Sequence, residues 1–501
     1  MCGIVGYIGD RDCADVLVNS LEKLEYRGYD SAGIAVLENG VIKVEKCKGR
    51  LENLRNKMAA DGKPYGHVGI GHTRWATHGE PSDINSHPHG NKRVTIVHNG
   101  IIENYRQIKE FLISEGYSFV SETDTETVAK LLDYYYTGDP VDTIIKVLAE
   151  IKGSYALGIM FRDFPDRIFA VRKDSPLIVG KGEHENFIAS DVPAIMQYTR
   201  DYYLLDTNDI AVLTKENIEF FNIHKERLEK KLNTADWDVD AAEKGGYEHF
   251  MLKEIHEQPK VIKDTINSVL TDGNISFESV GLSDEDMKNI QQVYIVACGS
   301  AYHVGMVAQY VIEELTSLSV RVELASEFRY RQMKLAKNSL AIIISQSGET
   351  ADSLAALRLC KEKGVKTLGI VNVVGSSIAR EADNVFYTLA GPEISVATTK
   401  AYSCQLVAAY LLAMQFAKAR GEISDERFAQ LVEEINTIPE KIEKILEDKE
   451  RILWFAAKVA NSKDIGLSKE DILKKLEDKL NISLQKAQEY LVMFGKQTSS
   501  R

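Results

Sequence analysis

The sequence predicts a strand-rich α+β domain, then an α/β domain built on a parallel sheet, and finally a helical tail. In residues 1–240, short apolar runs alternate with turn residues, a pattern typical of β-strands. From Val293 onward, apolar runs lead through polar turns into helix-like segments, which is typical of parallel sheets with crossover helices. After Glu422, apolar residues recur at near-helical spacing among charged ones.

The first domain is expected to be a layered α+β structure. Helices are predicted at 13–24, 104–115 and 126–135, and glycines follow the last two. Its strands are predicted at Gly3–Ile8, Ala32–Val36, His67–His72, Val94–His98, Tyr155–Phe161, Arg167–Arg172, Phe187–Ser190 and Ile210–Leu213.

The second domain is expected to hold ligands beyond the carboxyl ends of its strands, as open parallel sheets do. Helices are predicted at 302–315 and 351–363, after the first two of its strands. The strands are predicted at Val293–Ala297, Leu340–Ile344 and Thr367–Val371.

We predict four segments in all. They are a first domain at 1–240, an interdomain helix and linker at 241–283, a parallel-sheet domain at 284–430 and a helical tail at 431–501. In the tail, Ser468 is a candidate N-cap of a short amphipathic helix. Such helices most often have a structural role, and docking on a partner is the alternative.

The composition argues against several classes of protein. Apolar residues make up 44% and charged residues 27% of the 501, as in globular proteins. The 61 basic and 74 acidic residues give a net charge of −13 without long blocks of like charge, so general nucleic-acid binding is not expected. The nearly apolar stretch 406–417 is too short to span a membrane. Six cysteines without a C-x-x-C pair, and an N-terminus without signal-peptide features, predict a reducing cytoplasm.

Cys2 is the first candidate catalytic residue. Removal of Met1 would place a thiol and a free α-amino group on the same residue. The α-amine titrates near pH 8 and could serve as the general base for the thiol. Taken alone, a cysteine at position two is more often a small buried residue.

The stretch Gly71–Gly79 is the second candidate, with His87 and His89 close behind it. Arg74 could bind a substrate carboxylate through two parallel hydrogen bonds. The alternative is a surface or interdomain ion pair. The histidines could ligate a metal, but they lack acidic or cysteine partners at ligand spacing, and structural histidines are the commoner outcome.

Two further motifs carry polar groups next to predicted elements. His98-Asn99-Gly100 ends an apolar strand, and a side-chain amide beside a glycine N–H can stabilise an oxyanion. Asp124 could take the ammonium group of an amino acid while Arg74 takes its carboxylate. The ordinary alternatives are a turn at Asn99 and a helix start near Thr125.

Together these motifs resemble the glutaminase domain of class II glutamine amidotransferases, which are N-terminal-nucleophile hydrolases. The motifs occur in the family's order and at family-like spacing. They are Met1–Gly6, Tyr26–Gly33, Thr73–Gly79, His98–Gly100 and Thr123–Glu126.

The resemblance implies a role for each motif. Cys2 would attack the side-chain amide of glutamine, while Asn99 and Gly100 would form the oxyanion hole. Trp75 would gate ammonia toward a second site. The residues expected to hold the amino-acid end of glutamine are Arg74, Thr77, His78 and Asp124.

The parallel-sheet region offers a phosphate site. Ser345-Gln346-Ser347-Gly348-Glu349-Thr350 joins a predicted strand to a helix, so hydroxyls and backbone N–H groups meet at a helix N-terminus. Taken alone, this run would be a serine-rich helix cap. Ala297–Ala301 ends another strand in the same way, and Ser395–Ala401 follows downstream.

This pattern resembles the sugar isomerase (SIS) domain, a flavodoxin-like fold, and its combination with the glutaminase resembles the glutamine–fructose-6-phosphate aminotransferase family. The run Tyr247–Pro259 is also similar to that family. The resemblance extends from Met1 to about Ile465. The sugar-phosphate-binding residues that it implies are Cys298, Gly299, Ser300, Ser345, Gln346, Ser347, Thr350 and Val396.

Two residues of this region have alternative interpretations. Cys298 could be a nucleophile or redox switch, but its place at a strand end beside a glycine favours a role in shaping the sugar pocket. Lys400 could be a Schiff-base amine, but in the family's pattern it belongs to the binding loop.

The sequence departs from the family after Ile465. Members carry two SIS units, and Gly466-Leu467-Ser468 stands where the second would begin. In the family, the isomerase base, the sugar-opening histidine and the Schiff-base lysine come from that second unit, so no residue here is assigned those roles.

The resemblance implies a cytoplasmic, glutamine-dependent amidotransferase that hydrolyses L-glutamine and directs ammonia to fructose 6-phosphate, giving glucosamine 6-phosphate. We expect no metal or organic cofactor, no nucleic-acid or membrane partner, and a homodimer formed through the SIS domain. The alternatives are an uncoupled glutaminase or a non-catalytic sugar-phosphate sensor. Phosphoribosyl or asparagine-synthesising partner domains would need a pyrophosphate motif, which we do not find in the sequence.

Overall fold

The computed structural model describes residues 2–25, 28–76, 79–91, 93–235, 245–332, 334–448 and 474. The chain divides into two compact units, 1–432 and 433–501. In the second unit, the described residues include the helix α14 (Ile438–Glu447), and α13 (Asp425–Asn436) crosses the boundary. The predicted cap at Ser468 lies outside the described residues. None of the helices in the described part of the chain is long and apolar enough to cross a membrane.

Two antiparallel sheets form the first part of the larger unit. The eight-stranded sheet has the order β15-β11-β9-β10-β1-β4-β2-β3. Its strands are β1 (Gly3–Ile8), β2 (Ser31–Glu38), β3 (Val41–Lys48), β4 (Val68–Arg74), β9 (Ile178–Lys181), β10 (Asn186–Ala189), β11 (Asp201–Leu204) and β15 (Leu232–Thr234). The seven-stranded sheet has the order β14-β13-β12-β8-β7-β6-β5. Its strands are β5 (His89–Gly90), β6 (Val94–Ile102), β7 (Gly153–Phe161), β8 (Ile168–Lys173), β12 (Ile210–Leu213), β13 (Ile218–Phe221) and β14 (Arg227–Leu228).

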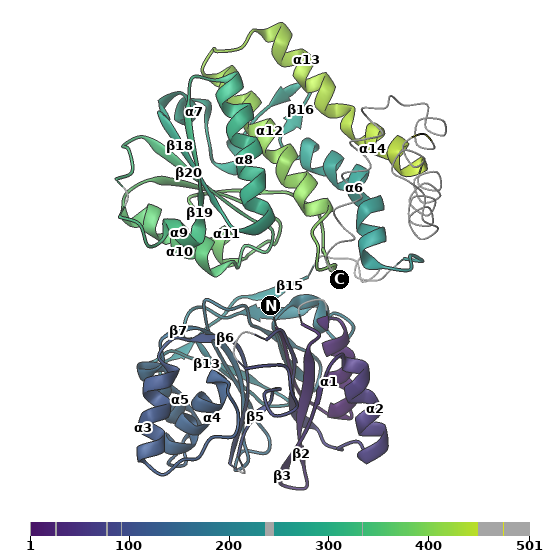
Figure 1. Ribbon diagram of the computed structural model, residues 1–501, viewed down its shortest axis with the longest axis vertical. Coiled ribbons are helices and arrows are strands. Elements are labelled where there is room, and N and C mark those ends of the chain that lie inside the picture. Colours follow the sequence, from purple (N-terminus) through teal and green to yellow (C-terminus); the bar gives the residue numbers. More distant parts are fainter. Residues whose placement is uncertain are drawn as a thin grey trace. The chain divides into compact units, whose positions relative to one another are not determined.

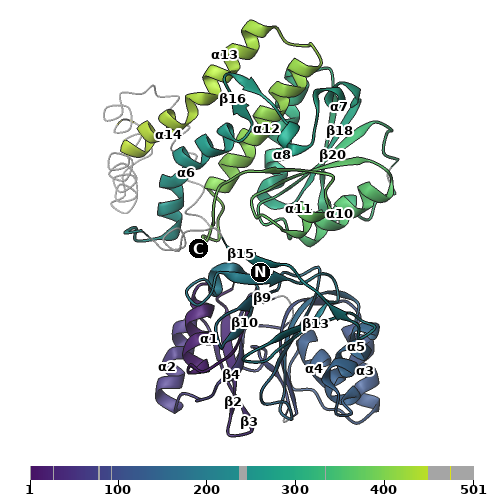
Figure 2. The same ribbon diagram turned by 180° about the vertical axis from the view of Figure 1, so that it is seen from behind.

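Helices cover the outer faces of both sheets, so four layers result (Figure 1 and Figure 2). The helices α1 (Cys13–Glu22) and α2 (Leu51–Asp61) lie on the first sheet. The second sheet is covered by α3 (Tyr105–Ser114), α4 (Asp124–Tyr135) and α5 (Pro140–Glu150).

Side chains of β1 show how the layers are filled. Successive residues of a strand point to opposite faces. Val5 and Tyr7 pack with the residues of α1, whereas Ile4 and Ile8 pack with residues of the second sheet such as Val97. Because both faces of β1 are buried, its sequence is a continuous apolar run with glycines, and the strand was predicted at its observed bounds.

A five-stranded parallel sheet forms the later part of the larger unit, in the order β19-β18-β20-β21-β22. Numbered along this domain, the order is 2-1-3-4-5, which is that of flavodoxin-like folds. The strands are β18 (Gln292–Ala297), β19 (Ser319–Leu324), β20 (Ser339–Ser345), β21 (Lys366–Val371) and β22 (Asn384–Tyr387). The predicted α+β and parallel α/β classes are thus confirmed.

Helices connect and flank these strands. They are α6 (Phe250–Asn267), α7 (Asp284–Asn289), α8 (Gly299–Leu315), α9 (Ala325–Phe328), α10 (Ala351–Glu362), α11 (Ser377–Glu381) and α12 (Lys400–Ala419). The predicted connector at 271–283 contains part of a short hairpin, β16 (Leu270–Thr271) with β17 (Asn274–Ile275). The helix predicted at 302–315 begins earlier, at Gly299, so the glycine turn itself is the first turn of α8.

Candidate active site

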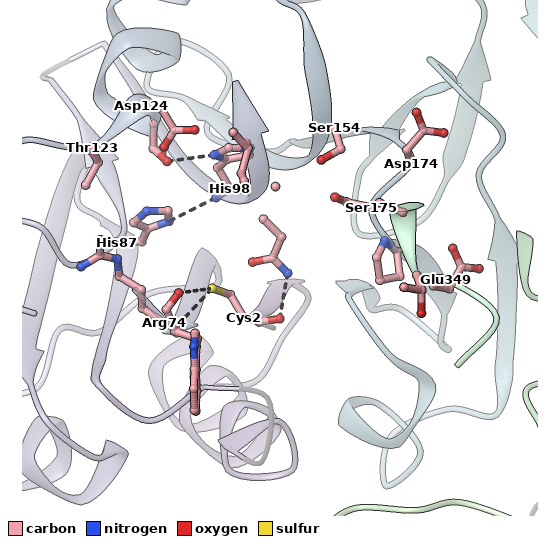
Figure 3. Close-up of a pocket in the computed structure, with 18 residues that line it drawn as sticks. Cys2, Arg74, His87, His98, Thr123, Asp124, Ser154, Asp174, Ser175 and Glu349 are labelled. Carbon is pink, nitrogen blue, oxygen red and sulfur yellow. Dashed lines mark hydrogen bonds between the residues drawn. The ribbon is translucent and has the colours of Figure 1, made fainter. Parts of the chain in front are cut away.

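Seven of the predicted site residues line one cavity of about 470 Å³. They are Cys2, Arg74, Trp75, Asn99, Gly100, Asp124 and Thr350. In Figure 3, Cys2 and Arg74 lie on one side of the cavity, and Asp174 and Glu349 lie on the other. Thr77 and His78, which were also expected to bind glutamine, lie outside the described residues.

Cys2 immediately precedes β1, whose pairing with β4 fixes its position. The Sγ atom accepts a hydrogen bond from the backbone N–H of Trp75 at 3.1 Å and lies 3.4 Å from the carbonyl oxygen of Trp75. Burial raises the pKa of the Cys2 thiol above its ordinary value, although the N–H of Trp75 lowers it in part. At neutral pH the thiol is therefore protonated and needs a base in order to react.

Asn99 is held so that its amide nitrogen faces Cys2. Its Nδ2 donates to the carbonyl oxygen of Cys2 at 2.9 Å. On its other side, the Nε2 of His72 lies 2.9 Å from the Oδ1 of Asn99 and 3.0 Å from the carbonyl oxygen of His98. Because both of these oxygens are acceptors, Nε2 of His72 carries the proton. His72 thus fixes which way the amide of Asn99 points.

Burial keeps His72 in its neutral form. Desolvation lowers the pKa of His72 to about 3, so the ring does not gain a charge near neutral pH. The ring stacks on that of His87 with a centroid distance of 4.1 Å. This role of His72 was not predicted, because the histidine-rich stretch was interpreted as structural or metal-binding. Within the described residues, no group of three or more His, Cys, Asp or Glu side chains is placed to hold a metal ion.

Gly100 must be a glycine for two reasons. Its φ is +129°, a backbone conformation that residues with a side chain rarely adopt. A Cβ atom there would also lie 2.1 Å from the carbonyl oxygen of Ser154 on β7. The strand β6 therefore brings its Asn-Gly pair to the cavity without the steric cost of a side chain.

Arg74 and Asp124 offer opposite charges to the same cavity. Each is 4% exposed, and both line the cavity. The Nη2 of Arg74 donates to the carbonyl oxygen of Gly79 at 3.0 Å. The Oδ2 of Asp124 accepts from the backbone N–H of Ile102 at 2.9 Å, and Asp124 is also the first residue of α4. Asp124 thus combines the helix-start position with a place in the cavity wall.

Trp75 stands at the edge of this cavity with 42% of its surface exposed. Its ring packs edge-on against Tyr29, with a centroid distance of 5.3 Å. The neighbouring Asp30 accepts a hydrogen bond from the backbone N–H of Ala76. The loop that carries Tyr29 and Asp30 therefore supports the backbone that contacts Cys2.

The predicted phosphate loop, residues Ser345–Thr350, links β20 to α10. The Oγ of Ser345 accepts from the backbone N–H of Gly348 at 3.1 Å and lies 2.9 Å from the Oγ1 of Thr350. Gly348 has a φ of +64°, and a Cβ atom there would lie 2.0 Å from the Oγ of Ser376. This tight turn leads into α10, whose N-terminus favours negative charge.

The predicted sugar-phosphate residues Cys298, Gly299 and Ser300 follow a neighbouring strand of the same sheet. The strands β18 and β20 are neighbours, with Ala297 opposite Ile344, so Cys298–Ser300 and Ser345–Thr350 follow adjacent strand ends. The strand order reverses at this point, and open α/β sheets bind ligands there. Cys298 is the N-cap of α8, and Gly299 and Ser300 are exposed. The helices α8 and α10 therefore begin after neighbouring strand ends, and a helix N-terminus favours a bound anion.

Arg172 of β8 connects the sheet of the first part to the phosphate loop. Its side chain is 6% exposed and lies 3.6 Å from the carboxylate of Glu349. The same carboxylate accepts from the N–H and the Oγ of Ser377 at 2.7 and 2.8 Å. Arg172 was not predicted as a site residue, because its partner is 177 positions away and no local motif marks it.

Comparison with known proteins gives two family matches. Residues 72–197 match the model described as a glutamine amidotransferase domain, and residues 286–415 match the SIS domain. The glutamine–fructose-6-phosphate aminotransferases [isomerizing] of Clostridium tetani and Caldanaerobacter subterraneus are each 54% identical over 468 residues, which is 93% of this chain and 77% of theirs. That of Methanosarcina mazei is 47% identical over 478 residues, covering 92% and 77%.

Two solved structures are also similar in part. The C-terminal domain of glucosamine-fructose-6-phosphate aminotransferase from Francisella tularensis is 41% identical, with a TM-score of 0.42, and the match covers 43% of this chain and 60% of that one. The glutamine phosphoribosylpyrophosphate amidotransferase of B. subtilis is 17% identical, with a TM-score of 0.41, and the match covers 77% and 90%.

Proposed function

The chain belongs to the glutamine–fructose-6-phosphate aminotransferase family, and we propose that it takes nitrogen from L-glutamine to convert fructose 6-phosphate into glucosamine 6-phosphate. The observation that carries this proposal is the cavity in which Cys2, Arg74, Asn99 and Asp124 meet. Glutamine hydrolysis needs a nucleophile and a hydrogen-bond donor that stabilises the oxyanion. It also needs two opposite charges that bind the α-carboxylate and the α-ammonium group of glutamine.

In the first step, the Sγ of Cys2 attacks the Cδ carbon of glutamine. Its proton passes to the α-amino group that removal of Met1 exposes on the same residue. The carbonyl π electrons move onto oxygen, where the Nδ2 of Asn99 and the N–H of Gly100 stabilise the oxyanion. When the tetrahedral intermediate collapses, the α-ammonium group of Cys2 passes its proton to the leaving nitrogen, the C–N bond breaks, ammonia leaves, and a thioester remains. Water then hydrolyses the thioester to glutamate and restores the thiol.

The charged residues of the cavity would orient the other end of glutamine. The guanidinium of Arg74 would bind the α-carboxylate, and the carboxylate of Asp124 would bind the α-ammonium. Asp124 already accepts the N–H of Ile102 through Oδ2, so its second oxygen would serve the ligand. Thr77 and His78 would complete this subsite by the family's pattern.

Ammonia would reach the sugar through the same cavity. The wall that contains Cys2 also contains Ser154, Asp174, Glu349 and Thr350, and the last two belong to the phosphate loop. Trp75 would act as the gate at the exposed edge. The hydroxyls of Ser345, Ser347 and Thr350, with the N-termini of α8 and α10, would bind the phosphate of fructose 6-phosphate. Residues 345–350 include no lysine, so N–H groups and hydroxyls would hold the phosphate in this loop.

We also propose that the protein works as a homodimer through its SIS domain in the cytoplasm. The six cysteines are free thiols, which suits a reducing compartment. Sedimentation of the full chain would measure the oligomeric state directly.

Replacing Arg74 by lysine is expected to raise the KM for glutamine by about 10- to 100-fold, because a lysine cannot form the two parallel hydrogen bonds of a guanidinium. The preference for glutamine over L-glutamine amide, which lacks the carboxylate, should fall by a similar factor. Arg93→Lys is the matched control, since Arg93 pairs with Asp133 outside the cavity. An unchanged preference in Arg74→Lys would show that Arg74 does not bind the carboxylate.

The proposed function as a whole is tested by measuring both products separately. With glutamine and fructose 6-phosphate present, the protein should release glutamate and form glucosamine 6-phosphate, while calorimetry detects binding of fructose 6-phosphate. Glutamate without amino sugar would identify an uncoupled glutaminase. Sugar-phosphate binding without either product would identify a sensor.

A further inference from the structure

The helix α6 carries two acidic side chains that contact a distant loop, residues Glu393–Lys400. The first part of this helix lies in the run Tyr247–Pro259, to which the proposed function gives no role. Figure 1 and Figure 2 both show α6 beside α12, the helix that this loop leads into.

Glu254 is the first of these residues and is 2% exposed. Its Oε1 accepts from the backbone N–H groups of Ile394 at 2.6 Å and Ser395 at 3.0 Å. The hydroxyl of Ser395 donates to its Oε2. Three donors from two neighbouring residues therefore meet one buried carboxylate, and hydrogen bonds to an ionised acceptor are among the strong ones.

Glu257, one turn further along α6, holds the other end of the loop. The Nζ of Lys400, a residue only 2% exposed, donates to its Oε2 at 2.7 Å. Lys253 lies 3.6 Å from the same carboxylate. Lys400 is buried while Glu257 is partly exposed, so removing Glu257 would leave a buried ammonium without its carboxylate partner. Lys400 is thus occupied by an ion pair, which argues against its alternative interpretation as a Schiff-base amine.

Between these two attachment points the loop projects outward. Val396 is 64% exposed, and Ala397 is exposed as well. Glu393 stabilises the end of the loop by accepting the N–H groups of Thr399 at 2.9 Å and Ala401 at 3.1 Å. The outward position of Val396 is therefore imposed by contacts on both sides of it.

Asn372 connects the residues just before this loop to the phosphate loop. Its backbone N–H donates to the carbonyl oxygen of Gln346 at 3.1 Å, and its Nδ2 donates to the carbonyl oxygen of Gly391 at 2.8 Å. Its Oδ1 accepts from the N–H of Ala390 at 2.8 Å. The residues that lead into the loop are therefore linked to the sugar-phosphate loop through Asn372.

We propose that Glu254 is a positioning residue that holds the loop Glu393–Lys400 against the sugar-phosphate site, so that α6 sets the affinity for the sugar phosphate. The inference rests on the proposed function, since it takes Ser345–Thr350 to be the phosphate loop. Glu254 acts through the loop and does not touch the substrate itself.

The test compares Glu254→Ala with Asp264→Asn by calorimetry with fructose 6-phosphate. Asp264 is the matched control because it also lies on α6 but pairs with the exposed Lys260. Loss of the loop's attachment should raise the Kd of Glu254→Ala about tenfold or more, the equivalent of one charge-assisted hydrogen bond. Glu254→Gln keeps the side-chain volume and one acceptor, so it should fold and give a smaller rise.

Hydrogen exchange supplies a second readout that concerns the loop alone. Peptides covering 390–400 should exchange at least about tenfold faster in Glu254→Ala, because the N–H groups of Ile394 and Ser395 lose their acceptor. Asp264→Asn should match the wild type. Equal Kd values in wild type and both Glu254 variants would overturn the positioning role. A wild type that fails to bind fructose 6-phosphate would instead overturn the proposed function, and the exchange result would still report the loop's attachment.

Discussion

Replacing Cys2 by alanine is expected to lower the rate of glutamate release from glutamine at least about a thousandfold, because no other thiol lies in the cavity to form the thioester. The remaining activity would come from binding and the oxyanion donors alone. Enzymatic detection of glutamate at saturating glutamine measures the loss, and calorimetry with fructose 6-phosphate should give the wild-type Kd.

The matched control is Cys47→Ala. Cys47 is also partly buried and free, but it lies on β3 outside the cavity. It should leave glutamate release unchanged. A preparation that retains Met1, checked by mass spectrometry, should lose hydrolysis as Cys2→Ala does, because its Cys2 lacks the α-amino base. Substantial hydrolysis by Cys2→Ala would remove the basis of the proposed mechanism.

The fold could be predicted where strands are buried on both faces. The strands β1, β18 and β20 are continuous apolar runs, since each lies within its sheet. The strands β3 and β19 were not predicted, because they lie at sheet edges. An edge strand needs no continuous apolar run, and β3 carries Lys43, Glu45, Lys46 and Lys48 among its apolar residues.

The site could be predicted where its residues form local motifs. Cys2, Arg74, Asn99 and Asp124 each belong to a short run with an evident chemical use, and the structure brings all four to one cavity. His72 could not be given its role in the same way. It lies on β4 of one sheet, whereas Asn99 lies on β6 of the other, so their contact depends on how the two sheets pack. The spacing of the two residues along the chain does not indicate which strands of the two sheets face each other.

The long-range contacts of Glu254 and Arg172 were not predicted for the same reason. Glu254 lies 140 positions before Ile394, and Arg172 lies 177 positions before Glu349. In a sequence, a glutamate on an amphipathic helix is usually a solvent-facing residue. Only the packing of α6 against α12 buries this one and gives it backbone N–H groups as partners.

Loss of the oxyanion donor should also reduce the rate of glutamine hydrolysis strongly. Asn99→Ala is expected to lower kcat for glutamine hydrolysis about 100- to 1000-fold with little change in KM, because the lost donor acts on charge that develops in the transition state. Steady-state kinetics of glutamate release separate the two constants. Asn104→Ala is the matched control, since Asn104 follows the same strand but bonds Glu150 and Lys152 outside the cavity.

His72→Phe refines this prediction, because it keeps a planar aromatic ring but removes the ring nitrogens, including the Nε2–H donor that orients Asn99. If His72 acts by orientation, kcat should fall about tenfold in His72→Phe, while the double variant with Asn99→Ala should be no slower than Asn99→Ala alone. The neutral state of His72, with its pKa near 3, means that this contribution should not change between pH 6 and 8. Additive losses in the double variant would mean that His72 acts independently of Asn99. A rise in KM in place of a fall in kcat for Asn99→Ala would mean that Asn99 binds the substrate and does not stabilise the oxyanion.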